Sequence, residues 1–275
     1  MKKYLLTIFL TLSCSTAVFA QNRKALEIYN RGLELQYAGK LDEAIIQYDK
    51  AIALDPKIAD AFNNRANIKF GRGDAAGAIS DYSRALELKP REGMTYFNRG
   101  VAFLQSEKFA EAVADFTKVI ETMPNYAMAY NNRGNARADL NDYRGAIADC
   151  DKAVELSPKL FEAFCNRGIT KQITKDYAGS IADMTVAAQL QPENVSIYLS
   201  RGLSYENKNV NAAIADYTKA IELDAESAQA YARRGLLLLE QKKKAEARRD
   251  LEKAIQLDSS LKTGYGEFLK LAKQL

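Results

Sequence analysis

The stretch AMAYNNRGNARADLNDYRGAIADCDKAVELSPKL, residues 127–160, decides how this chain folds. It carries the tripeptide Asn132-Arg133-Gly134 near its start and Pro158 near its end, and both features return along the chain at one period. The sequence has five prolines, and they stand 34 residues apart, at Pro56, Pro90, Pro124, Pro158 and Pro192. A fixed period of this length is typical of a repeat architecture.

A row of small residues runs in step with the prolines. Its members are Gly32, Ala66, Gly100, Gly134, Gly168, Gly202 and Gly235, and the arginines that directly precede them are Arg31, Arg65, Arg99, Arg133, Arg167, Arg201 and Arg234. When each repeat starts seven residues before its small residue, the repeats are 25–58, 59–92, 93–126, 127–160, 161–194, 195–227 and 228–261. The sixth repeat is one residue shorter than the others.

Each repeat is expected to form two amphipathic helices. In the first repeat, apolar residues recur at helical spacing over residues 25–38, and Gly39-Lys40 interrupts the pattern. Residues 41–54 form the second predicted helix. Asp55-Pro56 ends it, because proline restrains the residue before it and has no N–H to donate to the preceding turn.

This pattern resembles the tetratricopeptide repeat, whose signature is W-x2-L-G-x2-Y, then A-x3-F, then P. The small-residue row fills position 8 of that signature, and six repeats carry an aromatic residue at position 4: Phe62, Tyr96, Tyr130, Phe164, Tyr198 and Tyr231. The chain departs from the family in lacking tryptophan, in carrying arginine at position 7, and in losing the proline of the last two repeats.

The resemblance covers residues 21–275 and implies an all-α fold. The expected architecture is an α-α superhelix, a solenoid of seven 34-residue helix-turn-helix repeats. One repeat cannot bury its own apolar face, so neighbouring repeats stack to make the core. Residues 261–275 are expected to form a capping helix, with Leu261, Tyr265, Phe268, Leu269 and Ala272 in one apolar stripe.

The resemblance also implies that the first helices of successive repeats line a concave groove. Side chains expected there, at position 6 or beside it, are Asn30, Asn63, Asn64, Asn67, Asn98, Asn131, Asn132, Asn135, Asn166 and Arg233. An asparagine offers both a donor and an acceptor, so it can match one peptide unit of a bound backbone. The sequence therefore predicts a groove for an extended peptide. The alternative is that Asn-Arg-Gly is only the tripeptide that this repeat most often carries at these positions, and that the polar groove holds water and no ligand.

A second regularity pairs the arginine of position 7 with an aspartate at position 23. These aspartates are Asp81, Asp115, Asp149, Asp183, Asp216 and Asp250. A metal or acid site would appear once, whereas these residues recur in every repeat but the first. We therefore predict ion pairs between helices and no metal site. The sequence leaves open whether each aspartate binds the arginine of its own repeat or of the next.

Composition argues against catalysis. The sequence has no histidine, which excludes Ser-His-Asp and Cys-His nucleophile pairs and zinc sites that need an imidazole ligand. Its three cysteines cannot form a tetrahedral all-cysteine zinc site. We predict a non-catalytic interaction scaffold without a cofactor, whose partner is a protein or peptide. The alternative function is a structural subunit of an envelope assembly that uses the convex face or the ends of the solenoid.

Residues 1–20 have the parts of a secretory signal peptide. Lys2 and Lys3 precede a short apolar run, and Val18-Phe19-Ala20 offers a cleavage site before Gln21. The apolar run is too short to span a bilayer, so no stable membrane span is expected after cleavage. We expect an exported protein, periplasmic or secreted. A lipoprotein signal ending at Cys14 is the alternative, which the threonine at position 11 disfavours.

Net charge limits the class of partner. The net charge is +4, and about half of that excess belongs to the predicted signal peptide, so the remaining charge is too small to favour a nucleic-acid partner.

The two cysteines outside the predicted signal peptide are not expected to pair. Cys150 and Cys165 lie on predicted helices that run antiparallel. Position 24 is expected to face the core and position 5 the groove, so their side chains diverge and we expect two thiols rather than a disulfide.

Overall fold

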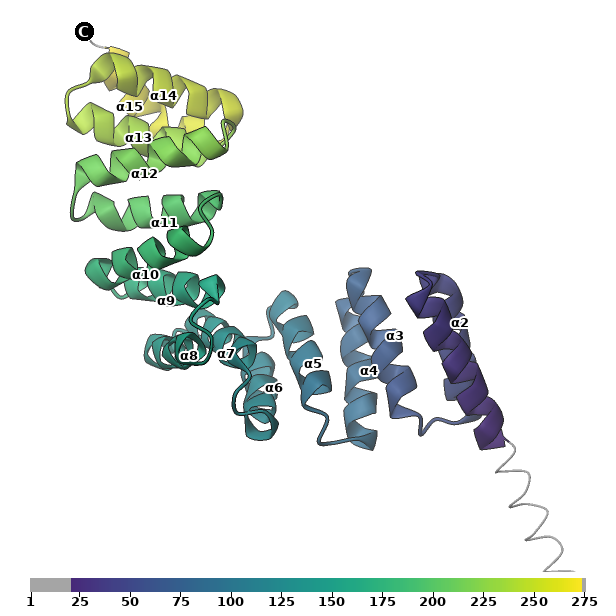
Figure 1. Cartoon of the computed structure of the whole chain (residues 1–275). Helices are drawn as coiled ribbons and strands as arrows, with labels where there is room; N and C mark the ends of the chain where they lie inside the picture. The colour runs from purple at the N-terminus through teal and green to yellow at the C-terminus, as the bar shows by residue number, and fades with distance from the viewer. Residues whose placement is uncertain (1–20, 274–275) are drawn as a thin grey trace, which may run out of the picture. The chain divides into compact units, whose positions relative to one another are not determined.

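The structure is a computed structural model, and it describes residues 21–273. The predicted signal peptide, with Cys14, and residues 274–275 of the predicted capping helix lie outside the described residues. Residues 21–273 contain helices and short connections and no strand (Figure 1). The predicted all-α fold, a solenoid of paired helices, is therefore confirmed.

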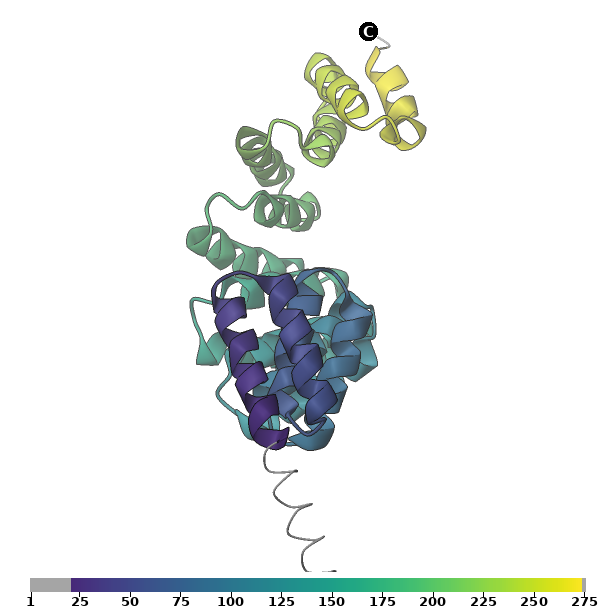
Figure 2. The ribbon, with the colours of Figure 1, turned by 90° about the vertical axis from the view of Figure 1, so that its right-hand side faces the viewer.

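The helices follow one another in pairs, beginning with the helical segment 21–37 and α2 (Leu41–Leu54). Figure 2 shows the two members of this first pair lying antiparallel. The further pairs are α3 (Ala59–Gly71) and α4 (Ala75–Leu88), α5 (Gly93–Gln105) and α6 (Phe109–Thr122), α7 (Ala127–Asp139) and α8 (Tyr143–Leu156), α9 (Phe161–Ile173) and α10 (Tyr177–Leu190), α11 (Val195–Glu206) and α12 (Val210–Leu223), and α13 (Ala228–Glu240) and α14 (Lys244–Leu257). A last helix, α15 (Leu261–Lys273), follows.

The chain divides into two compact units, Met1–Ala136 and Arg137–Leu275, which we call the N-terminal unit and the C-terminal unit. Each is described by itself below. Both are built from the same helix pairs, so one account of the pair serves for both.

The turn inside six of the seven described pairs contains one residue in the left-handed region, and the α11–α12 turn of the shortened repeat contains none. Gly39 and Gly73 take φ values of 75° and 83° there, and glycine adopts such values without steric cost. In later pairs Glu107, Asn141 and Lys175 take the same place with φ between 56° and 65°. The following helix often begins with a side-chain cap, as where Asp142 accepts a hydrogen bond from the backbone N–H of Gly145. The residue with positive φ and the capping side chain thus determine where the turn bends and where the next helix begins.

The turn between pairs keeps its geometry where the proline is lost. Asp55, which precedes Pro56, ends α2 in an extended conformation, with φ −139° and ψ 98°. Asp224 ends α12 with φ −140° and ψ 98°, although Ala225 follows it. Both backbone N–H groups donate to a carbonyl four residues earlier. The missing prolines of the last two repeats therefore do not alter the turn.

In the pairs that lie within one unit, position 8 on the first helix packs against position 24 on the second. A Cβ added to Gly202 would lie 2.7 Å from Cε1 of Tyr217, and one added to Gly100 would lie 2.9 Å from Cε1 of Phe116. Both aromatic rings are fully buried. A small residue at position 8 thus lets the ring of position 24 fill the space between the helices.

The last helix, α15, differs from its predicted packing at one residue. Ala272 is buried, and Leu261, Tyr265 and Leu269 are partly buried, as a single apolar stripe requires. Phe268 is 43% exposed, so this member of the predicted apolar stripe is not buried. Because α14 is the main neighbour of α15, only one side of the helix is covered, and Phe268 lies on its flank.

Candidate partner-binding surface

The arginine of position 7 joins the two helices of its own repeat. In five repeats its Nε and Nη2 groups donate to both carboxylate oxygens of the aspartate at position 23, over 2.5–3.0 Å. The pairs are Arg65–Asp81, Arg99–Asp115, Arg167–Asp183, Arg201–Asp216 and Arg234–Asp250. The question left open by the sequence is answered for these repeats: the bond lies within the repeat.

The same arginine also reaches the preceding repeat. Its Nη1 group donates to an oxygen at position 25 of that repeat, which sequence reasoning missed. The bonds are Arg65 to Asp49, Arg99 to Ser83, Arg133 to Thr117, Arg167 to Asp151, Arg201 to Thr185 and Arg234 to Thr218. The signal was present, because position 25 carries a carboxylate or hydroxyl in every repeat. We call each such cluster of arginine, aspartate and position-25 acceptor an arginine junction.

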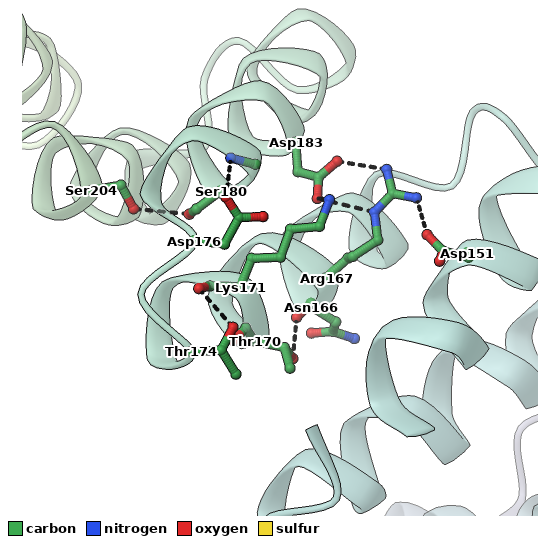
Figure 3. A network of polar contacts seen from close by, with 11 residues as sticks. Asp151, Asn166, Arg167, Thr170, Lys171, Thr174, Asp176, Ser180, Asp183 and Ser204 are labelled. Carbon is green, nitrogen blue, oxygen red and sulfur yellow. Dashed lines mark hydrogen bonds and ion pairs between the residues drawn. The ribbon is translucent and has the colours of Figure 1, made fainter. Parts of the chain in front are cut away.

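Extra cations balance the charge of the junctions that hold two carboxylates. In Figure 3, Asp183 receives bonds from both Arg167 and Lys171, while Asp151 binds the remaining arm of the arginine. The repeat that contains Arg65 has the same arrangement, with a lysine at position 11, Lys69, 2.8 Å from the carboxylate of Asp81. Two carboxylates therefore face two cations in each case, which accounts for the lysine at position 11 of these two repeats.

The junctions are partly buried, and their charges perturb one another. Hydrogen bonding to Asp81 raises the pKa of Arg65, and burial raises the pKa of Asp115, against the lowering effect of Arg99. Each guanidinium also lies 5.4–5.7 Å from the ring centroid of the aromatic residue at position 4, as Arg167 does over Phe164. These aspartates are engaged as structural ion pairs, and the described residues contain no group of side chains that could hold a metal ion.

Tyrosines at position 24 connect the core to the polar side chains of the first helices. The hydroxyl of Tyr82 donates to Oδ1 of Asn67 over 2.7 Å, and that of Tyr217 donates to Oε1 of Glu206 over 2.6 Å. Tyr48 makes the equivalent bond to Gln36. The buried tyrosine therefore orients a side chain on the outer face of the first helix.

In the N-terminal unit, the predicted groove asparagines link the first helices of successive repeats. Nδ2 of Asn64 donates to the hydroxyl of Tyr29 over 3.1 Å, and Oδ1 of Asn63 accepts from Thr95 over 3.2 Å. Asn63 also donates to Asn64 over 3.3 Å. These bonds place the first helices side by side, and they use the amides of Asn63 and Asn64 in linking the repeats.

Asn67 and Asn98 form a pair that keeps hydrogen-bonding groups free for a ligand. Nδ2 of Asn98 donates to Oδ1 of Asn67 over 3.2 Å. Among the described residues, Nδ2 of Asn67 and Oδ1 of Asn98 have no hydrogen-bond partner. The pair borders a hollow of about 180 Å³ that is also lined by Phe70, Tyr82, Phe97 and Val101. One donor, one acceptor and an apolar hollow thus lie together on this face.

The remaining asparagines of the N-terminal unit differ in access. Asn30 and Asn135 are exposed, and Asn132 is partly buried. Asn131 is only 3% exposed and donates to Oδ1 of Asn132 over 3.2 Å. Its burial places Asn131 beneath the surface, where it supports Asn132 and is not itself available to a ligand.

In the C-terminal unit, the corresponding face holds fewer amides and more apolar side chains. Asn166 borders a hollow of about 190 Å³ between α9 and α11. Nη1 of Arg233 lies 3.4 Å from Oε2 of Glu206, and the buried Nε of Arg233 has no partner among the described residues. Ile169 and Ile173 are exposed one turn apart on α9. The groove predicted from repeated asparagines is therefore amide-rich only in the N-terminal unit.

The two described cysteines are free thiols, as expected, and their reactivity as nucleophiles is low. Cys150 is buried and Cys165 is partly exposed. Burial raises the pKa of Cys150 to about 12 and that of Cys165 to about 11. Both thiols are protonated near neutral pH, which makes them poor nucleophiles.

Models of known protein families match most of the chain. Models described as tetratricopeptide repeats match residues 59–92, 95–126, 127–160, 195–227 and 228–261, and one described as a TPR repeat matches residues 32–73. The chain belongs to the tetratricopeptide repeat proteins. No curated protein matches it in sequence. Within the described residues, no helix of this tetratricopeptide repeat protein has the length and apolar character needed to cross a membrane.

Solved structures share the fold of this tetratricopeptide repeat protein. One is a tetratricopeptide repeat protein from Parabacteroides merdae, 22% identical, with a TM-score of 0.67 over 92% of this chain and 100% of that chain. Another is MamA from Desulfovibrio magneticus, 22% identical, with a TM-score of 0.57 over 61% of this chain and 96% of the other. A third is YrrB, described as a TPR protein with an unusual peptide-binding site, 22% identical, with a TM-score of 0.57 over 71% and 97%.

Proposed function

We propose that this protein is a non-catalytic scaffold that binds an extended segment of a partner protein along the first helices of its repeats. The Asn67–Asn98 pair carries the proposal. It presents an unused amide N–H and an unused amide oxygen beside an apolar hollow. A peptide unit of a bound chain could accept from Asn67 and donate to Asn98, as an added β-strand would.

Repeat spacing supports an extended ligand. Adjacent packed helices lie about 8–10 Å apart, and an extended chain advances about 3.3 Å per residue. One repeat therefore corresponds to about three residues of ligand. A groove that contacts every third residue can hold the backbone while leaving the side chains between to determine specificity.

The proposal that the scaffold is non-catalytic rests on the state of the side chains that could act in catalysis. The chain has no histidine, five of the position-23 aspartates are bound bidentately by arginine, and both described thiols have raised pKa values. The similarity to YrrB, which is described as having a peptide-binding site, agrees with a binding role. The fold alone is shared with it at this level of identity.

We also propose that the protein is exported and acts in the periplasm or outside the cell. The support is residues 1–20, with their basic start, short apolar run and Val18-Phe19-Ala20 cleavage site. Mass spectrometry of the protein from its native host is expected to find Gln21 at the N-terminus. A mature chain that starts at a lipid-modified Cys14 would instead establish the lipoprotein alternative.

Replacing both Asn67 and Asn98 by alanine is expected to weaken peptide binding about tenfold, because two neutral hydrogen bonds are lost. The assay is retention of the full chain on a cellulose-bound array of random decapeptides, followed by titration of the retained peptides. Asn125→Ala, in an exposed turn, is the matched control and should bind as wild type does. Equal binding by the folded double variant, with helicity checked by circular dichroism, would show that this pair does not hold the ligand.

A further inference from the structure

The hollow between α9 and α11 in the C-terminal unit has a different chemistry from the Asn67–Asn98 site. Its apolar lining includes Phe161, Cys165, Ile169 and Ile197, and Glu162 stands on its rim. We infer that this hollow takes an aliphatic side chain of the bound segment and that a basic residue next to it pairs with Glu162. This inference rests on the proposed function and names the kind of segment that is bound.

The apolar side chains around the hollow are exposed without a partner in the structure. Ile169 is 42% exposed, and Ile173, one turn further along α9, is 51% exposed. Ile169 occupies position 9 of its repeat, the position that Asn67 holds at the other site, and Ile173 occupies position 13. A contiguous exposed apolar patch beside a polar rim is typical of an interaction surface. The same face of the first helices thus changes from amide to aliphatic character in the C-terminal unit.

The size of the hollow fits one aliphatic side chain. Its volume is about 190 Å³. That is on the order of six water molecules at about 30 Å³ each, which is room for a leucine, isoleucine or methionine side chain. Each methylene buried there is expected to improve affinity about fourfold. A peptide with serine at this place would leave the hollow filled with water.

The charges of this face favour a basic neighbour over an acidic one. Positions 2, 5, 6, 9, 12 and 13 of the repeat are those expected to face the groove. In α9, α11 and α13 they carry three carboxylates, Glu162, Glu206 and Glu240, against one cation, Arg233. That cation lies beside Glu206, and Glu162 has no ion-pair partner among the described residues. No lysine stands at any of these positions, although the chain as a whole has a net charge of +4. An acidic ligand would therefore meet like charge here.

A designed peptide array tests the inference. The full chain is applied to cellulose-bound decapeptides of serine and glycine that carry a central Leu-Lys, Leu-Glu, Ser-Lys or Ser-Glu pair. Retention on Leu-Lys is expected to exceed that on each of the other three at least tenfold. Ile169→Asp should abolish the preference for leucine, and Glu162→Lys should turn the preference for lysine into one for glutamate.

Controls separate failure of this inference from failure of the proposed function. Ile46→Asp changes an isoleucine that is 49% exposed on α2, the second helix of its pair in the N-terminal unit, and should keep the wild-type preferences. Retention of all four peptides equally, or unchanged preferences in Ile169→Asp and Glu162→Lys, would overturn the inference while leaving peptide binding intact. Absence of retention on these peptides and on the random array alike would overturn both.

Discussion

Replacing Asp183 by alanine is expected to lower the free energy of unfolding by about 3–5 kcal/mol, because breaking a buried ion pair leaves an uncompensated charge. Asp183 is 4% exposed, and its two oxygens accept from Arg167 over 2.5 and 3.0 Å. It also accepts from Lys171 over 2.9 Å. Its removal leaves two cations facing the single carboxylate of Asp151, which is more than half exposed.

Urea unfolding followed by circular dichroism measures this loss. Asp176→Ala is the matched control, because Asp176 is an exposed aspartate that caps α10, and losing a helix cap costs about 1 kcal/mol. Repeat proteins unfold in parts, so hydrogen exchange of α9 and α10 should show where the stability was lost. A cost for Asp183→Ala no greater than that of the cap would contradict a stabilising role for the arginine junction.

The second large effect is expected at alkaline pH. Burial raises the pKa of Tyr48 to about 12, and it also raises the pKa values of Tyr82 and Tyr217, where the hydrogen bond to Glu206 adds to the shift for Tyr217. Above pH 10 the unfolded chain releases these protons while the folded chain keeps them. The stability from these hydroxyls is therefore fully present below pH 10 and is lost as pH rises above it, by about 1.4 kcal/mol per pH unit for each tyrosine.

The triple variant Tyr48→Phe, Tyr82→Phe, Tyr217→Phe no longer has these three titrating groups. Its free energy of unfolding is therefore expected to fall less steeply above pH 10, by about 4 kcal/mol per pH unit. Near neutral pH each lost hydroxyl should cost about 1 kcal/mol. Phe116 fills the equivalent position in the third repeat, so the ring packs without a hydroxyl. Urea unfolding between pH 8 and 12 gives the slope, and Tyr37→Phe, 89% exposed, is the control. If the free energy of unfolding depends on pH in the triple variant as it does in the wild type, the three buried tyrosines do not cause the loss of stability at alkaline pH.

The helices of this protein are predictable from sequence because their signals are local. The 34-residue period predicts that the first helix of the second repeat starts at residue 59, and α3 begins at Ala59. The sequence also predicts the row of small residues at position 8, and one of them, Gly202, leaves the room that the ring of Tyr217 fills. Both features depend only on residues that are close in sequence and on a period that repeats.

Partner choice between side chains was not predictable in the same way. The period could not decide which arginine each aspartate binds, because that depends on how far one helix is rotated against the next. The role of position 25 was missed for the same reason, since Arg99 and Ser83 belong to different repeats. Asn131 shares its residue type with the surface asparagines but is buried. Sequence pattern gave residue type at each position, and the structure was needed for access and partner.

The third arm of the arginine junction is not equally strong along the chain. At Arg65 and Arg167 it binds a carboxylate, whereas at Arg99, Arg201 and Arg234 it binds a hydroxyl. Charge-assisted hydrogen bonds are about twice as strong as neutral ones. Under tension, we therefore expect the hydroxyl links to yield before the carboxylate links where the apolar packing is alike. One side chain per repeat thus contributes to the local stiffness of the solenoid, independently of the surface that binds a partner.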